Sequence, residues 1–129
     1  MTVLVGYLPT PEGEAAFAAA LDEAQRRREP LVLLNSPRSG APVSADVAPD
    51  SVVTEMSSRA AAAGVGLEVR QAAHSGEVAD EVLRVAQETD ASVIVIGLRK
   101  RSPVGKLLMG SSAQRILLDA DRPVLAVKP

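Results

Sequence analysis

The chain alternates between short, continuous apolar runs and longer stretches with apolar residues at helical spacing. Residues 2–8, 30–35 and 91–97 are rich in aliphatic and β-branched residues, and 91–97 is apolar throughout. Runs of this kind, closed by proline, glycine or polar residues, predict strands buried in a parallel sheet. In residues 66–74, apolar and charged residues alternate, which predicts an edge strand with one solvated face. A further strand is predicted at residues 122–129.

The stretches between these runs have the pattern of amphipathic helices. They are predicted at residues 10–28, 49–64, 76–90 and 112–120. Thr10 is a typical N-cap residue, and Pro11 suits the first position of a helix. Phe17 and Ala20 fall on one face of the first helix, and Gly64 is a typical residue to end the second.

Strands that alternate with helices of this length predict an α/β fold. We expect one domain over residues 1–129, with an open, doubly wound, parallel sheet of five strands in the order 3-2-1-4-5 and helices on both faces. In such sheets ligands bind beyond the carboxyl ends of the strands, where the strand order reverses. That point lies between the first and fourth strands, so the segments that follow them are the candidate site.

Composition narrows the function. The chain has no cysteine, which removes disulfides, thiolate metal ligands and cysteine nucleophiles. Its net charge is -2, so no general attraction to nucleic acid is expected, and with one Tyr, one Phe and no Trp it has little to stack on bases. Apolar runs stay well short of about 18 residues, so no membrane span is predicted. The amino-terminal residues do not resemble a signal peptide, and we expect a cytoplasmic protein.

The segment "GLRKRSPVGKLLMGSSAQ" follows the fourth predicted strand and has two possible roles. Ser111 and Gln114 have the spacing of a capping box, with Ser111 as the N-cap. The free N–H groups of a helix start suit a phosphate, and Ser112 adds a hydroxyl donor. Lys100 adds a positive charge. The alternative is a loop that only joins a strand to a helix, because glycine and serine begin many helices that bind nothing.

The same segment resembles the universal stress protein family. Nucleotide-binding members carry a glycine, two residues, a second glycine, nine residues and then Gly-Ser or Gly-Thr. Here Gly97 matches the first glycine, Lys100 stands at the second, and Gly110 with Ser111 matches the end. The following "SAQRILLDADRPVLAVKP" is also similar, and the resemblance extends over essentially the whole chain. It implies an adenine nucleotide alpha-hydrolase-like fold and a small stress-response protein that binds ATP or AMP.

The chain departs from the family pattern in two places, the end of the first strand and the second glycine. The first strand of nucleotide-binding members ends in an aspartate followed by Gly-Ser, and here Leu8, Pro9 and Thr10 stand at those places. Leucine cannot make the hydrogen bonds by which that aspartate holds adenine or ribose. Lys100, in place of a glycine, would either obstruct the approach of backbone to the ligand or supply a cation.

The first hypothesis is therefore a ligand sensor. Its phosphorylated ligand, an adenine nucleotide by resemblance, lies with its phosphates at the helix start. The predicted ligand-binding residues are Leu8, Thr10, Gly97, Lys100, Gly110, Ser111 and Ser112. Tyr7 borders the site, and the family resemblance adds Val32 to Asn35 as further candidates.

Two other functions stay open. In the second hypothesis the protein is an interaction module without a nucleotide, and Leu8 and Lys100 mark an abandoned site. The third, an ATP-hydrolysing enzyme, is the weakest, because no carboxylate is evident near the phosphates to hold Mg²⁺ or to position water. We therefore expect a binding protein without catalytic residues or a metal site.

The strand between Pro123 and Lys128 bears on assembly. It is apolar on both faces, and at an edge of the sheet it would be exposed and adhesive. Pairing with the same strand of a second copy would cover it in a two-fold symmetric dimer, as the family resemblance also implies. Alternatively, the flanking prolines, Pro123 and Pro129, already protect a short edge.

Overall fold

The computed structural model describes residues 1–35, 50–71, 77–98 and 110–129. Its strands are β1 (Thr2–Tyr7), β2 (Leu31–Asn35), β3 (Leu67–Gln71), β4 (Ala91–Gly97) and β5 (Val124–Val127). Its helices are α1 (Pro11–Arg27), α3 (Asp50–Ala62), α4 (Val78–Glu88) and α5 (Ser111–Asp119). Each lies within one or two residues of a predicted element, except where β3 and α4 meet residues 72–76, which lie outside the described part of the chain.

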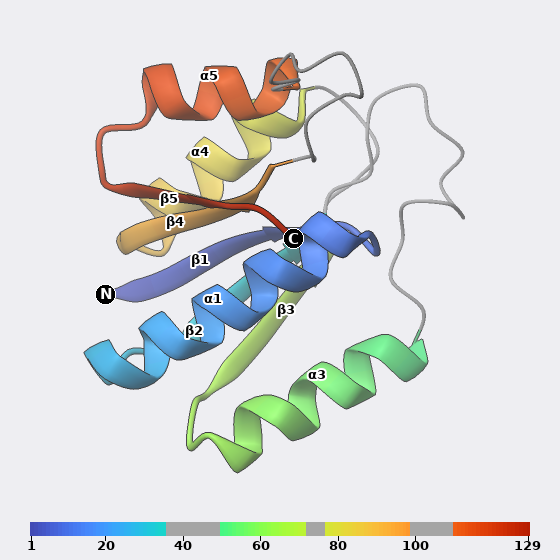
Figure 1. Ribbon diagram of the computed structural model, residues 1–129. Helices are drawn as coiled ribbons and strands as arrows, with labels where there is room; N and C mark the ends of the chain where they lie inside the picture. The colour runs from blue at the N-terminus through green and yellow to red at the C-terminus, as the bar shows by residue number, and fades with distance from the viewer. Residues whose placement is uncertain (36–49, 72–76, 99–109) are drawn as a thin grey trace.

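The strands form one parallel sheet in the order β3-β2-β1-β4-β5, which confirms the predicted topology. At its centre, Val5 of β1 lies between Leu33 of β2 and Val95 of β4. Helices α1 and α3 cover one face, and α4 and α5 cover the other (Figure 1). The order in which strands are added to the sheet reverses between β1 and β4, which are neighbours. The segments that follow these two strands were selected from the sequence, and both leave the sheet at its carboxyl edge.

The core has two layers because successive side chains of a strand point to opposite faces of the sheet. Val93 and Val95 of β4 belong to the cluster under α1 and α3, whereas Ile94 and Ile96 belong to the cluster under α4 and α5. Both sets are buried, as the unbroken apolar pattern predicted. Within the described residues, no helix is both long and apolar enough to cross a membrane.

Helix α1 begins as predicted. Thr10 is its N-cap, and the Thr10 hydroxyl oxygen accepts a hydrogen bond of 3.1 Å from the N–H of Gly13. The helix ends at Arg28, which adopts a left-handed conformation with φ of 56°. Gly64 ends α3 in the same region, with φ of 73°, where glycine avoids the strain that a side chain introduces.

The start of α5 differs from the prediction. Its N-cap is Gly110, whose carbonyl accepts the N–H of Gln114 at 3.1 Å, and Ser111 is already the first helical residue. No side chain caps this end of the helix. The predicted capping box of Ser111 and Gln114 is therefore wrong, because it requires the serine to precede the helix with an extended backbone.

Candidate ligand-binding site

A cavity of about 120 Å³ opens at the carboxyl edge of the sheet, between the strand ends and helices α4 and α5. It brings together three of the predicted ligand-binding residues: Leu8, which follows β1, Gly97 at the end of β4, and Ser112 in the first turn of α5. The remaining described lining residues are Gly6, Tyr7, Leu34, Val78, Val82, Ile96, Ala113 and Ile116. The topology thus unites segments that lie about ninety residues apart in the chain.

Two glycines allow the backbone around this cavity to pack closely. A Cβ atom at Gly97 would lie 2.2 Å from the carbonyl oxygen of Glu12, so the end of β4 can touch the first turn of α1 only as glycine. A Cβ atom at Gly13 would lie 1.8 Å from the carbonyl oxygen of Leu8. Gly13 was missed by sequence reasoning. A glycine in the first turns of a helix costs stability, and that cost was the available signal for a packing role.

The start of α5 offers donor groups beside the cavity. Gly110 and Ser111 are exposed and Ser112 is half-buried, and the first backbone N–H groups of a helix have no partner within the helix. Gly110, Ser111 and Thr10 do not line the cavity itself. The hydroxyl oxygen of Thr10 already accepts the Gly13 N–H as part of the α1 cap. Lys100, also among the predicted ligand-binding residues, lies outside the described residues.

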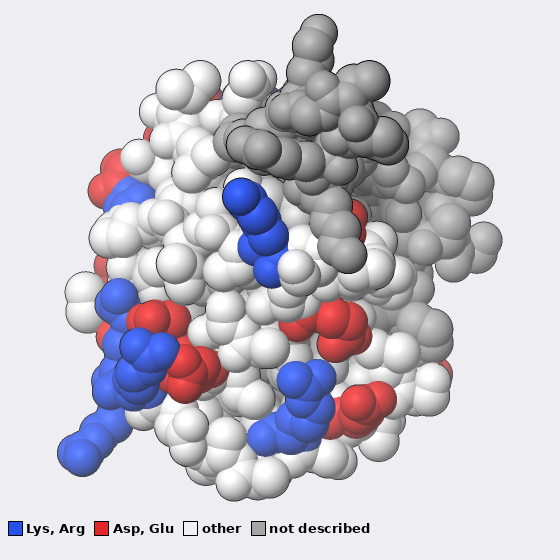
Figure 2. All heavy atoms as spheres, in the orientation of Figure 1, with Lys and Arg blue, Asp and Glu red and all other residues white. Residues whose placement is uncertain are grey.

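Among the described residues, the charged side chains near this helix start are largely engaged with one another. Arg115, on α5, forms an ion pair with Asp80 of α4 and lies 3.6 Å from the Asp119 carboxylate. On the face shown in Figure 2, basic and acidic side chains lie close to one another at several places. The attraction for a phosphate at this edge, as far as the described residues show it, comes from the helix start and not from a cluster of cations.

Tyr7 connects the site to the opposite face of the sheet. Its side chain is 2% exposed and packs in the cluster under α1 and α3, where its hydroxyl donates a hydrogen bond of 2.9 Å to Glu14. Burial, reinforced by this contact with the Glu14 carboxylate, raises the pKa of the Tyr7 phenol far above its ordinary value. The phenol therefore stays protonated at neutral pH.

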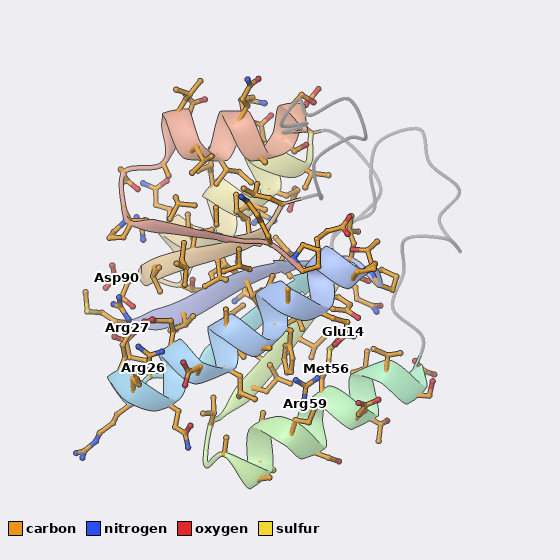
Figure 3. The ribbon with its side chains drawn as sticks, in the orientation of Figure 1. Glu14, Arg26, Arg27, Met56, Arg59 and Asp90 are labelled. Atoms are coloured by element: carbon orange, nitrogen blue, oxygen red, sulfur yellow. The ribbon has the colours of Figure 1, made fainter. Side chains whose placement is uncertain are left out.

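Glu14 in turn links α1 to α3. Arg59 of α3 approaches the second carboxylate oxygen of Glu14 at 3.5 Å and stacks over the ring of Phe17 at 4.8 Å (Figure 3). Asn35, at the end of β2, is fully buried and donates a 3.0 Å hydrogen bond to the carbonyl of Tyr7. This network fixes the strand end that borders the cavity. Sequence reasoning missed Glu14 and Arg59 because their pairing spans two helices.

The lining of this cavity is suited to binding a small molecule. Among the described residues, no group of three or more His, Asp or Glu side chains is placed to hold a metal ion. The lining of the cavity is mainly aliphatic, with donor groups at its rim on α5. An apolar cavity with a few polar groups at its margin is the usual form of a small-molecule site.

Comparisons with known proteins agree with this fold. The model of the universal stress protein family matches residues 1–128. A universal stress protein of Mycolicibacterium smegmatis is 41% identical over 127 residues, which cover 98% of this chain and 97% of the relative.

Solved structures are similar over the same extent. A universal stress protein from Archaeoglobus fulgidus superimposes with a TM-score of 0.81 at 29% identity, covering 98% of this chain and 97% of that one. A structure of the Archaeoglobus fulgidus universal stress protein in complex with dAMP gives a TM-score of 0.69 at 22% identity, covering 98% and 96%. At that identity, the second structure bears on the fold alone.

Proposed function

The chain belongs to the universal stress protein family, and on that premise we propose that it is a ligand-responsive regulatory protein of the stress response and not an enzyme. Its ligand is an adenine nucleotide or another phosphorylated compound. The phosphates lie at the start of α5, and the organic part lies against the cavity that Leu8, Gly97 and Ser112 line. A cytoplasmic location is part of the proposal, and fractionation of cells that express a tagged chain tests it.

One observation carries this proposal: the apolar cavity lies directly beside the free N–H groups of a helix start. Neither feature alone identifies a ligand. Together they suit a molecule with an anionic end and an apolar body, because the helix dipole attracts the anion and the aliphatic walls bury the remainder. The dAMP complex of the Archaeoglobus fulgidus protein is the reason to try adenine nucleotides first.

A second candidate function rests on the size of the cavity. At about 120 Å³ it is smaller than the cavities of roughly 300–1,000 Å³ that enclose most of a drug-sized ligand. In this alternative the site no longer binds a nucleotide, and the protein acts as a dimeric interaction module. Leu8, which has no hydrogen-bonding side chain, then lines an abandoned site.

Thermal unfolding with and without ligand separates the two functions. We expect ATP or AMP to raise the melting temperature, since a ligand at about 100 times its Kd stabilises the folded state by about 2.7 kcal/mol. The double variant Ser111→Ala, Ser112→Ala should lose most of this shift. The double variant Ser57→Ala, Ser58→Ala is the matched control, because it removes two exposed serines from α3, far along the chain from α5. Absence of a shift with ATP, AMP and phosphate would favour the interaction module.

The proposal includes a homodimer formed through β5, because the two edges of the sheet differ. At one edge, β3 carries Glu68 and Arg70, and charges on an edge strand discourage pairing with another chain. At the other edge, β5 has the sequence VLAV without a charge, and all four residues are only partly buried. An uncharged, half-buried edge of this kind supports pairing with the same strand of a second copy.

Backbone alternation provides a test of this dimer. The carbonyl of Pro123 accepts the N–H of Ile94 in β4, and the carbonyl of Val127 accepts the N–H of Leu98, which follows β4. The alternate residue Ala126 therefore presents its own N–H to the outer edge. Ala126→Pro removes that donor and should shift the protein towards the monomer in light scattering. Ala126→Ser keeps the donor and should leave the mass unchanged. A wild-type protein that is monomeric at all concentrations would contradict the proposed dimer.

A further inference from the structure

The walls of the cavity that the described residues form are almost entirely aliphatic. They come from β1, β2, β4, α4 and α5, and include Leu8, Leu34, Val78 and Ile96. Among the described lining residues, Tyr7 and Ser112 have side chains that end in a polar group. The hydroxyl of Tyr7 is bound to Glu14, on the face of the sheet under α1 and α3. Ser112 therefore supplies the one side-chain hydroxyl that these lining residues offer to a ligand.

The aliphatic lining determines how sugar hydroxyl groups would affect the affinity of a ligand. Ser112 lies at the helix start, where the phosphates are proposed to lie, and the other described lining side chains offer a sugar hydroxyl no hydrogen bond. A hydroxyl group that is buried against them loses its water partners, and an unpaired buried polar group lowers affinity about tenfold or more. A hydroxyl group that stays in solvent gains nothing from the site. In both cases the presence of sugar hydroxyls does not raise the affinity. A purine ring, in contrast, buries apolar faces against aliphatic side chains at little cost.

We infer that this site does not recognise the ribose hydroxyls of its ligand and instead selects a phosphate joined to a flat or apolar body. The inference rests on the proposed function and names the ligand class of the same site. Leu8 is the specificity-determining residue, because it places an alkyl side chain at the end of β1, beside Gly97 and Ser112.

The backbone around Leu8 allows its side chain to be exchanged. The Leu8 carbonyl accepts the N–H of Thr10 at 2.8 Å and packs against Gly13. Both contacts use backbone atoms, and the Leu8 side chain is only partly buried. A carboxylate at this position would accept hydrogen bonds from hydroxyl groups without removing any contact that holds the turn.

The experiment is calorimetric titration with AMP, 2′-deoxy-AMP, 2′,3′-dideoxy-AMP and inorganic phosphate. For the wild-type protein we expect the Kd values of the three nucleotides to agree within about twofold, because the site forms no hydrogen bond that depends on a ribose hydroxyl. In Leu8→Asp, AMP should bind about tenfold tighter than the dideoxy compound, as expected for a hydrogen bond to a charged group. Leu8→Ala is the control, and it should raise the Kd values of all three nucleotides by a similar factor.

The outcomes separate the two proposals. A wild-type protein that binds AMP ten times more tightly than the dideoxy compound would refute the inference and leave the proposed function intact. A wild-type protein that binds none of the nucleotides would refute the proposed function and this inference with it. The Kd values of the wild-type protein test the inference even if Leu8→Asp does not fold. A thermal melt of each variant shows whether it is folded.

Discussion

Replacing Gly97 with alanine tests whether this glycine serves the fold or only a ligand. The Cβ atom of alanine would lie 2.2 Å from the carbonyl oxygen of Glu12 and 2.6 Å from its carbonyl carbon. Both are backbone atoms in the first turn of α1, so no rotation of a side chain relieves the overlap. The start of α1 must move away from β4, or the end of β4 must bend.

The cost follows from overpacking. Additional atoms in a well-packed region cost about 1–3 kcal/mol, and we expect the upper end because backbone must shift. With an unfolding entropy of about 2.1 cal/mol/K per residue over 129 residues, each kcal/mol lowers the melting temperature by about 4 °C. Gly97→Ala should therefore melt about 10 °C below the wild-type protein, without any ligand present.

The assay is thermal unfolding followed by circular dichroism. Gly110→Ser is the matched control, because a Cβ atom at Gly110 meets nothing within 4 Å and serine is a favoured N-cap residue. This control should melt at or slightly above the wild-type temperature. If Gly97→Ala melts within about 2 °C of the wild-type protein, the close contact between β4 and α1 is wrong and Gly97 is needed at most for a ligand.

Substitutions at three further positions test the caps and the buried phenol. Thr10→Ala should lower the free energy of unfolding by about 1 kcal/mol in urea titrations, because it removes the acceptor of the Gly13 N–H, whereas Thr10→Ser should retain it. Arg28→Gly should raise that free energy by about 0.5–1 kcal/mol by relieving a left-handed backbone, and an unchanged midpoint would contradict this. Tyr7 is the only tyrosine and the chain has no tryptophan, so near-ultraviolet absorbance titrates this phenol alone. Because its folded-state pKa is raised above about 10, the stability it contributes is intact below pH 10 and is lost progressively as the pH rises further. Titration of the phenol in the folded protein near pH 10 would refute its burial together with its contact with Glu14, and Tyr7→Phe should abolish the signal.

The sequence by itself determined the elements and their order. Residues 91–97 are buried on both faces of the sheet as their unbroken apolar pattern predicted, and Thr10 caps α1 as its type and place predicted. These features depend on periodicity and local backbone preference, which neighbouring residues specify. The strand order followed from the connectivity of a doubly wound sheet, which leaves few alternatives.

The sequence predicted where in the fold the candidate site lies, but it did not predict which side chains line the cavity there. Leu8, Gly97 and Ser112 do line one cavity, because the carboxyl ends of β1 and β4 meet at the same edge. Val78 and Val82 of α4 also line the cavity, but the sequence pattern predicts only that they belong to an amphipathic helix at residues 76–90. The position of these side chains relative to the strand ends depends on how α4 packs on the sheet, and local sequence patterns do not predict that packing.

Only the tertiary structure decided the contacts between elements. Gly13 has to be glycine because the carbonyl of Leu8 lies against it, and Tyr7 is held by Glu14, which Arg59 of α3 approaches in turn. Even the first residue of α5 was misplaced by one position, because serine and glycine are both good N-cap residues and sequence preference separates them by only a few tenths of a kcal/mol. Such choices are determined by distances between segments that are remote in the chain, and these distances exist only once the sheet and its helices are packed.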